Sequence, residues 1–240
     1  MFKRSMTFII LISVFLVGCG LSTTTITGTG DVVTQDKDIS GFDGVDVSHG
    51  FEVTISQGES YSVSLKVDKR VLDYLYVERD GNTLKIGLTP GGSFNLINVD
   101  MEAEVTMPEL RRLDCSGGSR VEITGFQSTE SFNMDMSGGS NLRGDIDAGD
   151  TVFDVSGGSN VSLAGSGGDL NVDSSGGADV DLSDYSVENA YIDASGASTV
   201  MVNVSGTLDV SASGAASVLY LGDPSLGTIN ISGGASIDSR

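Results

Sequence analysis

A short phrase of serine, glycine and other small residues recurs seven times in the second half of this chain, and it constrains the fold more than any other feature. The phrase reads SGGS at its first copy and SGGA at its last. The copies open at Ser116, Ser137, Ser156, Ser175, Ser195, Ser213 and Ser232. Their spacings are 21, 19, 19, 20, 18 and 19 residues. Self-similarity at such a period is typical of folds that stack one structural unit on the next.

Apolar and polar residues alternate on both sides of each phrase. Three positions before the serine stand Leu113, Met134, Phe153, Val172, Ile192, Val210 and Ile229. Five positions after it stand Val121, Leu142, Val161, Val180, Val200, Val218 and Ile237. Alternation with period two predicts a half-buried strand on each side of the phrase. The glycines between the two strands allow the chain to turn a corner.

These observations predict an all-β protein, a right-handed parallel β-helix (β-solenoid) with about 19–20 residues per coil. One coil consists of a strand, a glycine corner, a second strand and a return. Successive coils would stack about 4.8 Å apart, and each would bury its apolar face against its neighbours. A β-sandwich of short hairpins is the alternative, but it would not require apolar columns in a fixed register.

The solenoid domain is predicted to span residues 39–240, with regular repeats over 111–240 and less regular coils over 39–110. Residues 45–55 fit the repeat template, whereas a hairpin is expected to turn near residues 80–82 and a short helical turn near 68–75. Cys115 falls in an inward column, which predicts a buried free thiol. No strong stop signal follows Ser232, so one end of the stack is expected to stay open and could pair with other chains.

The N-terminus carries the features of an export signal. Lys3 and Arg4 precede an apolar run over residues 8–17, and the segment ends Leu16-Val17-Gly18-Cys19. The pattern predicts a lipoprotein signal peptide over 1–18 and lipidation of Cys19. A secretory peptide with a chance cysteine is the alternative. Residues 19–38, rich in Thr, Gly and Ser, are expected to form a flexible, lipid-anchored tether.

Charge and residue types argue against nucleic-acid binding and against catalysis. The formal net charge is −20, which repels nucleic acid. The chain has one histidine, His49, and no tryptophan, and its serines are corner residues present in seven copies. A nucleophile is not built seven times over, so we expect no catalytic residues and no cofactor. Arg111, Arg112, Arg120 and Arg143 are expected to pair with aspartates or to hold an anion.

An aspartate column stands two positions before the serines. Its members are Asp114, Asp135, Asp154, Asp173 and Asp193, followed by Ser211 and Asn230. They alternate with inward residues, so the stack would align five outward carboxylates in a ladder with repulsion between neighbours. Hydrogen bonds from the corner and water could offset this repulsion. Alternatively, the ladder could bind divalent cations weakly or form part of a sugar-binding or sugar-cleaving face.

Several segments together resemble the bacterial family called putative auto-transporter adhesin, head GIN domain. They are residues 42–55 (FDGVDVSHGFEVTI), 107–114 (MPELRRLD), the SGGS-type phrases and 217–224 (SVLYLGDP). The resemblance covers roughly residues 39–238 and implies an envelope lipoprotein or secreted protein with β-helical repeats. It supplies no catalytic residues.

The sequence therefore predicts a non-catalytic cell-envelope lipoprotein with an adhesin-like binding or structural role. We expect it to be exported and anchored by lipid at the outer membrane or cell surface. Its expected partners are the membrane, through the anchor, and surface polymers, glycans or envelope proteins; self-association could occur through the solenoid ends. A carbohydrate-active β-helix enzyme or a polysaccharide-binding protein is the alternative.

Overall fold

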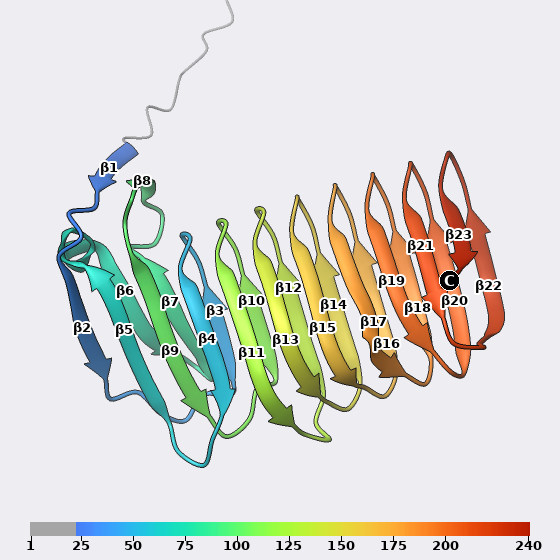
Figure 1. Ribbon diagram of the computed structural model, residues 1–240, viewed down its shortest axis with the longest axis horizontal. Helices are drawn as coiled ribbons and strands as arrows, with labels where there is room; N and C mark the ends of the chain where they lie inside the picture. The colour runs from blue at the N-terminus through green and yellow to red at the C-terminus, as the bar shows by residue number, and fades with distance from the viewer. Residues whose placement is uncertain (1–22) are drawn as a thin grey trace, which may run out of the picture.

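A computed structural model describes residues 23–240 of the chain, which form an all-β solenoid with two long sheets facing each other (Figure 1). The eleven-stranded sheet runs, in spatial order, β2 (Val32–Lys37), β5 (Ser62–Asp68), β9 (Met101–Met107), β4 (Glu52–Gln57), β11 (Arg120–Gln127), β13 (Asn141–Asp147), β15 (Asn160–Ser166), β17 (Asp179–Val187), β19 (Thr199–Val204), β21 (Ser217–Leu221) and β23 (Ser236–Ser239). The ten-stranded sheet runs β6 (Leu75–Asp80), β7 (Thr83–Leu88), β3 (Gly44–Val47), β10 (Arg112–Cys115), β12 (Phe132–Met136), β14 (Thr151–Val155), β16 (Leu170–Ser174), β18 (Ala190–Ala194), β20 (Thr207–Ala212) and β22 (Ser225–Ile231).

Each repeat supplies one strand to each sheet, and the SGGS-type phrase forms the corner between them. Along the corner, the first glycine has a positive φ, as at Gly176 with φ 73°. The fourth residue often turns its hydroxyl back: Ser119 Oγ donates to the Ser116 carbonyl at 2.8 Å and Ser198 Oγ to the Ser195 carbonyl at 2.9 Å. The strand–corner–strand prediction is therefore confirmed, and the phrase supplies both the backbone freedom and the hydrogen bond that the corner needs.

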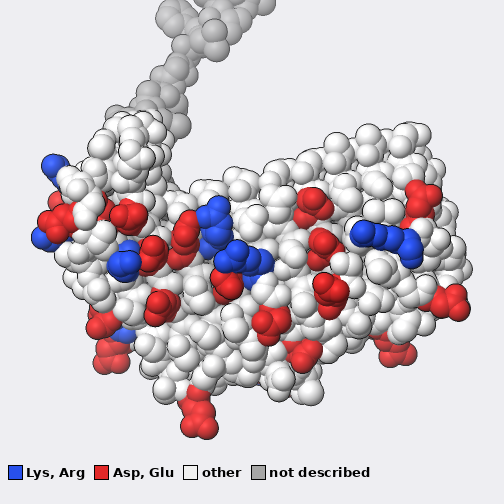
Figure 2. All heavy atoms as spheres, in the orientation of Figure 1, with Lys and Arg blue, Asp and Glu red and all other residues white. Residues whose placement is uncertain are grey.

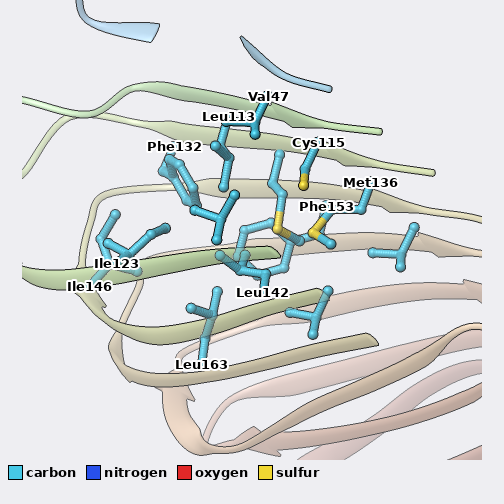
Figure 3. Packing of buried hydrophobic residues seen from close by; sticks show 14 of the residues in the cluster. Val47, Leu113, Cys115, Ile123, Phe132, Met136, Leu142, Ile146, Phe153 and Leu163 are labelled. Carbon is cyan, nitrogen blue, oxygen red and sulfur yellow. The ribbon is translucent and has the colours of Figure 1, made fainter. Parts of the chain in front are cut away.

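The strands pair in the register that the apolar columns predict. Leu113 lies beside Met134, which lies beside Phe153, and the column continues in the same way to Ile229. Inward residues from the two sheets meet and fill the space between them (Figure 3). Phe132 packs edge-on against Phe153 at 5.9 Å between ring centroids. Cys115 is a buried free thiol, as predicted, and burial raises its pKa to about 11.

In the N-terminal region the order along the chain departs from the order in space. The coil of β3 and β4 lies between the coil of β7 and β9 on one side and that of β10 and β11 on the other. The link after β9 must therefore cross the edge of the β3–β4 coil. Two backbone bonds mark this crossing: Gly58 N donates to the Met107 carbonyl at 3.0 Å and Arg111 N to the Asp43 carbonyl at 2.7 Å.

Antiparallel strands and a helical turn close this end of the stack. β2 and β6 are the outermost strands, and each pairs antiparallel with its neighbour. The predicted hairpin is confirmed as β6 and β7, and the helical turn as a 3-10 helix, η1 (Lys69–Tyr74). A separate two-stranded arm pairs β1 (Thr23–Thr27) with β8 (Ser93–Ile97). No helix within residues 23–240 is long and apolar enough to cross a membrane.

The flexible tether expected over residues 19–38 is corrected by these strands. Residues 23–27 form β1 and residues 32–37 form β2. β2 pairs along its whole length with β5, and Ile26 of β1 is buried. Thr and Val are good strand formers, so a composition rich in small polar residues was a poor guide here. The predicted signal peptide and Cys19 lie outside the described residues.

Candidate functional site

The stack aligns the predicted aspartate column into one row on the outer side of the ten-stranded sheet. Neighbouring coils pair Asp114 with Asp135, Asp135 with Asp154, Asp154 with Asp173 and Asp173 with Asp193. Asp46 of β3 extends the row by one place, because it pairs with Asp114. We call these six residues the aspartate ladder. Ser211 and Asn230 continue the row on the last two coils.

Partial burial and neighbouring carboxylates disfavour ionisation of two members of the aspartate ladder, Asp154 and Asp46. The pKa of Asp154 is raised, first by burial and then by Asp173 and Asp135. The pKa of Asp46 is raised by burial and by Asp114. In the described part of the chain, a basic side chain pairs with the ladder only near one end, where Arg112 Nε and Asp114 Oδ2 lie 2.7 Å apart. The middle of the ladder therefore carries unneutralised charge.

The ladder does not gather its carboxylates around a point. Each coil contributes one aspartate, and within residues 23–240 no group of three or more His, Cys, Asp or Glu side chains is placed to hold a metal ion. Within the described residues, the divalent-cation alternative therefore has no converging ligand set to support it.

A second polar row at the opposite corner was missed from the sequence. Here side chains bridge one coil to the next: Asp169 N donates to Asp150 Oδ1 at 3.0 Å, Asn189 Nδ2 to Asp169 Oδ1 at 2.9 Å, and Thr207 N to Asn189 Oδ1 at 2.9 Å. Asp150, Asp169 and Asn189 stand six positions before their serines. The signal was available, but only three of seven copies carry such a residue, so it is weaker than the aspartate column.

A shallow groove lies on the outer side of the ten-stranded sheet beside this polar row. Its volume is about 340 Å³, and Val152, Asn171, Tyr191 and Asp209 line it from successive coils in register. Tyr191 is 50% exposed and Val152 39%, although large apolar side chains are otherwise mostly buried. We call this the Tyr191 groove. Its residues occupy the column four positions before the serine, where the sequence analysis attached no role to them.

The Tyr191 groove offers three kinds of contact to a ligand. The Tyr191 ring provides a flat apolar surface, and its hydroxyl can donate or accept. Asn171 carries two amide donors and a carbonyl acceptor, and the carboxylates of Asp150, Asp169 and Asp209 accept. Asp150 and Asp169 each use one oxygen for a bond between coils, and no such bond engages the other oxygen. The arrangement suits a ligand with apolar faces and many hydroxyl groups.

His49, the single histidine, holds a structural position in the first corner. Its Nδ1 accepts a hydrogen bond from Leu88 N at 3.3 Å and lies 2.8 Å from Ser48 Oγ. Its ring meets Phe94 edge-on at 5.7 Å, and burial lowers its pKa. The hydrogen bond to Nδ1 comes from a backbone amide of β7, so the His49 side chain ties the corner to that strand.

The outer side of the eleven-stranded sheet carries a different pattern of charge. Basic and acidic side chains lie next to one another on the face shown in Figure 2. Arg143 pairs with Glu122 at 2.8 Å, Lys66 with Glu102 at 3.4 Å, and Arg120 with Glu52. The prediction that the arginines pair with aspartates is confirmed for Arg112, which pairs with Asp114, and is wrong for Arg120 and Arg143, whose partners are glutamates. The charges within each of these pairs neutralise one another, so these residues offer little net charge to a ligand.

Comparisons with known proteins agree on family and fold. Residues 41–224 match the family described as "Putative auto-transporter adhesin, head GIN domain", and no curated protein matches the chain. A putative adhesin from Bacteroides fragilis NCTC 9343 has a similar structure, with a TM-score of 0.83 at 16% identity over 90% of this chain and 100% of that one. A putative lipid binding protein from Parabacteroides distasonis ATCC 8503 gives 0.68 at 22%, again over 90% and 100%. A putative adhesin from Parabacteroides merdae ATCC 43184 gives 0.65 at 13%, over 90% and 99%.

Proposed function

The chain belongs to the putative auto-transporter adhesin, head GIN domain family, and we propose that it is a non-catalytic lipoprotein of the bacterial cell envelope that binds a glycan at the Tyr191 groove. The observation that carries the proposal is the exposure of Tyr191 and Val152 beside the Asn171 amide and three carboxylates, each of which uses one oxygen for a bond between coils. Isolated exposed apolar residues need no explanation, but an aromatic ring inside a polar-lined groove is a common feature of ligand sites.

Charge narrows the class of glycan. The groove contains Asp150, Asp169 and Asp209, and the ladder lies on the same face of the sheet. No Lys or Arg occurs between Gly144 and Ser239, whereas fourteen Asp and Glu residues do. Such a surface repels uronic acids and sulfated sugars. The ligand is therefore a neutral or amino-sugar glycan, and a long polymer could continue along the flat face of the stack.

Binding to immobilised glycans tests the groove. We expect the chain from Gly20 to Arg240, which contains every core residue, to bind a neutral or amino-sugar polymer and not heparin or alginate. Tyr191→Ala should weaken binding about ten-fold, equivalent to about 1.4 kcal/mol, whereas Tyr191→Phe keeps the ring and most of the affinity. Asn133→Ala is the matched control, because Asn133 is exposed in the same column outside the groove.

Two results would contradict the proposed site. Equal loss of binding in the Asn133 and Tyr191 variants would place the ligand elsewhere on the sheet. Release of new reducing ends from the polymer would favour the carbohydrate-active enzyme instead.

The anchor is a separate part of the proposal. An apolar run ending in Leu16-Val17-Gly18-Cys19 supports lipidation of Cys19. Cys19→Ser should abolish labelling by a radioactive fatty acid and release the protein from membranes, or leave an uncleaved precursor. A variant that is still cleaved, labelled and retained like the wild type would rule the anchor out. Cys115 serves as an internal control, since it is buried and should take no label.

A further inference from the structure

The last coil exposes an apolar surface. In the other repeats, the next coil covers the corresponding surface. Within residues 23–240, β22 and β23 each pair with a strand on one side only. Leu226 is 52% exposed and Ile231 39%, and Ile229 and Ile237 are partly buried. They continue columns that are closed one coil earlier, where Leu208, Val210, Ala212 and Val218 are 0–2% exposed. The end of the stack thus has the apolar face and the unpaired backbone of an interior coil.

The opposite end of the stack has charged residues on its edge strands, which disfavour pairing with another chain. Its outermost strands carry charges: Asp36 and Lys37 lie on β2, and Glu78, Arg79 and Asp80 lie on β6. Charged side chains on edge strands oppose pairing with another chain. At the open end, β22 has the sequence SLGTINI and carries none, and β23 carries one, Asp238.

Charged residues become sparse toward the open end. The four residues Asp145, Asp147, Asp150 and Asp154 fall in a single repeat, whereas residues 224–237 contain no charged residue. The aspartate ladder also stops here, because Ser211 and Asn230 replace aspartate on the last two coils. Two identical ladders brought end to end would repel each other. The substitutions remove that repulsion only at the face where a second ladder would approach.

We propose that a second copy of this chain covers the open coil, so that two solenoids meet through their β22–β23 ends about a two-fold axis. A two-fold contact needs a self-complementary surface, and this one is largely apolar and bordered by strand edges that can pair antiparallel. Its charges are Asp238 on β23 and Arg240 beyond it, which are opposite in sign. Head-to-tail stacking would instead bring β22 against the charged strands β2 and β6. The inference does not depend on the glycan site, which lies on the flank of the stack.

The size of the surface sets the strength of association. Two sheets about 10 Å apart and a seven-residue strand about 23 Å long give a cross-section of a few hundred Å² per copy. Stable dimers bury roughly 800 Å² per partner. The dimer is therefore weak in solution, with a Kd on the order of 0.1–1 mM, and anchoring on a membrane raises the effective concentration.

Sedimentation equilibrium of the chain from Gly20 to Arg240, up to about 1 mM, tests this directly. We expect a reversible monomer–dimer equilibrium, and hydrogen exchange in β22 and β23 should slow as the concentration rises. Ile231→Lys should weaken association at least ten-fold. Val152→Lys is the matched control, because Val152 is equally exposed at 39% on the flank. Asn230→Asp provides a second variant that leaves the apolar face untouched, since Asn230 is exposed and points outward.

Four results would contradict a dimer formed through the β22–β23 ends. A monomer up to 1 mM, or a dimer that Ile231→Lys and Asn230→Asp leave unchanged, would overturn it. A dimer weakened by Val152→Lys instead would move the contact to the flank. In membranes, the full chain carrying Asn230→Cys should yield a dimer with a flexible bismaleimide, whereas Asn133→Cys should not; equal yields would also overturn the proposal.

Discussion

The two halves of this solenoid reach the same coil cross-section by different means. From β10 onward, each coil follows the previous one in sequence and repeats its corner and its apolar columns, and the first five coils also repeat the aspartate. Before β10, coils are assembled out of chain order, and one of them places His49 where the later coils have glycine. One short repeated sequence is enough to specify a periodic stack, because every coil makes the same contacts with its neighbours. A coil that ends the stack needs its own residues at each position, because its contacts occur only once.

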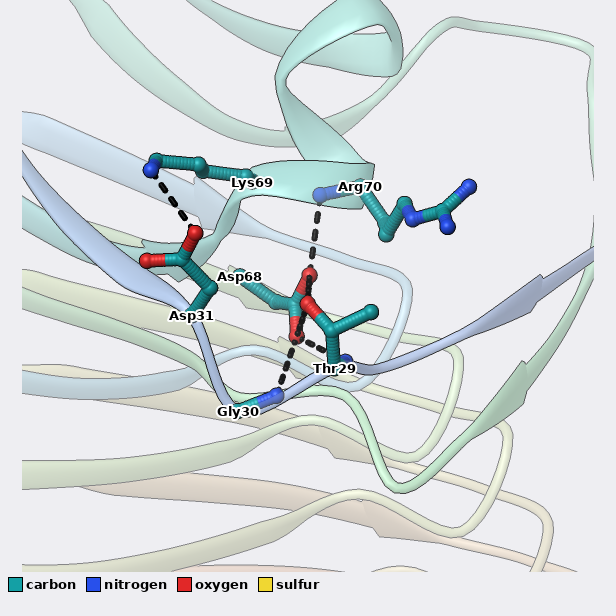
Figure 4. A network of polar contacts seen from close by, with 6 residues as sticks. All are labelled: Thr29, Gly30, Asp31, Asp68, Lys69 and Arg70. Carbon is teal, nitrogen blue, oxygen red and sulfur yellow. Dashed lines mark hydrogen bonds and ion pairs between the residues drawn. The ribbon is translucent and has the colours of Figure 1, made fainter.

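Buried polar groups show the difference most clearly. In the regular coils, three buried corner serines, Ser119, Ser140 and Ser198, repeat one local bond to the carbonyl three residues earlier. At the irregular end a single carboxylate, Asp68, is 0% exposed and accepts three backbone amides: Thr29 N at 2.6 Å, Gly30 N at 3.0 Å and Arg70 N at 2.9 Å (Figure 4). It joins the chain before β2 to the start of η1. The Asp68 side chain thus links residues 29–30 to the first turn of η1.

The largest effect is expected from a substitution at the regular corner. At Gly176 φ is 73°, and an added Cβ would lie 2.7 Å from the Gly157 carbonyl oxygen of the previous coil. Gly176→Ala combines backbone strain of about 1–2 kcal/mol with this clash. We expect a loss of at least about 2 kcal/mol, or about 4–8 °C in Tm, measured by thermal and urea unfolding.

The adjacent glycine is the control for this substitution. A Cβ at Gly177 would lie 3.8 Å from its nearest contact, and Ala197 and Ala215 occupy the same place in later coils. Gly177→Ala should therefore change stability by less than about 0.5 kcal/mol. If the two alanine variants unfolded alike, the close approach of successive corners would not be what requires glycine.

The same contrast explains how far the sequence could predict the structure. Apolar columns such as Leu113 to Ile229 fixed the register of the regular coils, because a period-two strand has only one face to bury. No such column specified that the coil of β7 and β9 would precede that of β3 and β4, since this order depends on a crossing link. Tyr191 was missed because the residue types in its column, four positions before the serine, differ from copy to copy. Features that recur are visible in one sequence, and features that occur once depend on contacts distant in the chain.

Removing Asp68 should loosen the irregular end and leave the regular coils intact. Asp68→Ala removes the shared acceptor of three backbone amides. We expect faster hydrogen exchange in residues 23–37 and 69–74, with little change after residue 112, because stacked units depend mainly on their neighbours. Asp31→Ala is the control: Asp31 pairs with Lys69 at 2.7 Å, but both side chains are more than half exposed. Equal loosening throughout the stack would show that the two regions unfold as one unit.

The pH dependence of this end follows from the same bonds. The amides of Arg70, Thr29 and Gly30 lower the pKa of Asp68 below its ordinary value of 3.8. The stabilisation is therefore present above pH 3.8 and is lost as the pH falls toward the lower, folded-state pKa. Hydrogen exchange in residues 23–37 should accelerate, beyond its intrinsic pH dependence, over that window in the wild type and not in Asp68→Ala.

The smallest effect is expected from the aspartate ladder, where repetition itself is unfavourable. Changing Asp135, Asp154 and Asp173 together to Asn keeps their shape and removes three like charges from one row. The change removes four opposed pairs of like charges. At about 0.2–0.3 kcal/mol for each exposed pair, the triple variant should gain about 1 kcal/mol and melt about 2–4 °C higher at neutral pH. The raised pKa of Asp154 sets the sign of the pH dependence. Its penalty is present at neutral pH and disappears as the pH falls through its folded-state pKa, so the advantage of the variant should shrink toward pH 3.8.

The same variant separates repulsion from cation binding. Sodium and calcium chloride at equal ionic strength should raise the Tm of the wild type similarly, because salt screens exposed charges without preference. A ladder that bound calcium would instead gain RT ln(1 + [L]/Kd) from calcium alone. We expect no calcium-specific shift at millimolar concentration, because each coil offers one carboxylate and no three acidic side chains in residues 23–240 converge to hold a metal ion. A calcium-specific rise in Tm that vanished in the triple variant would replace repulsion with metal binding as the role of the ladder. It would also show that a row of single carboxylates can act as a site without converging.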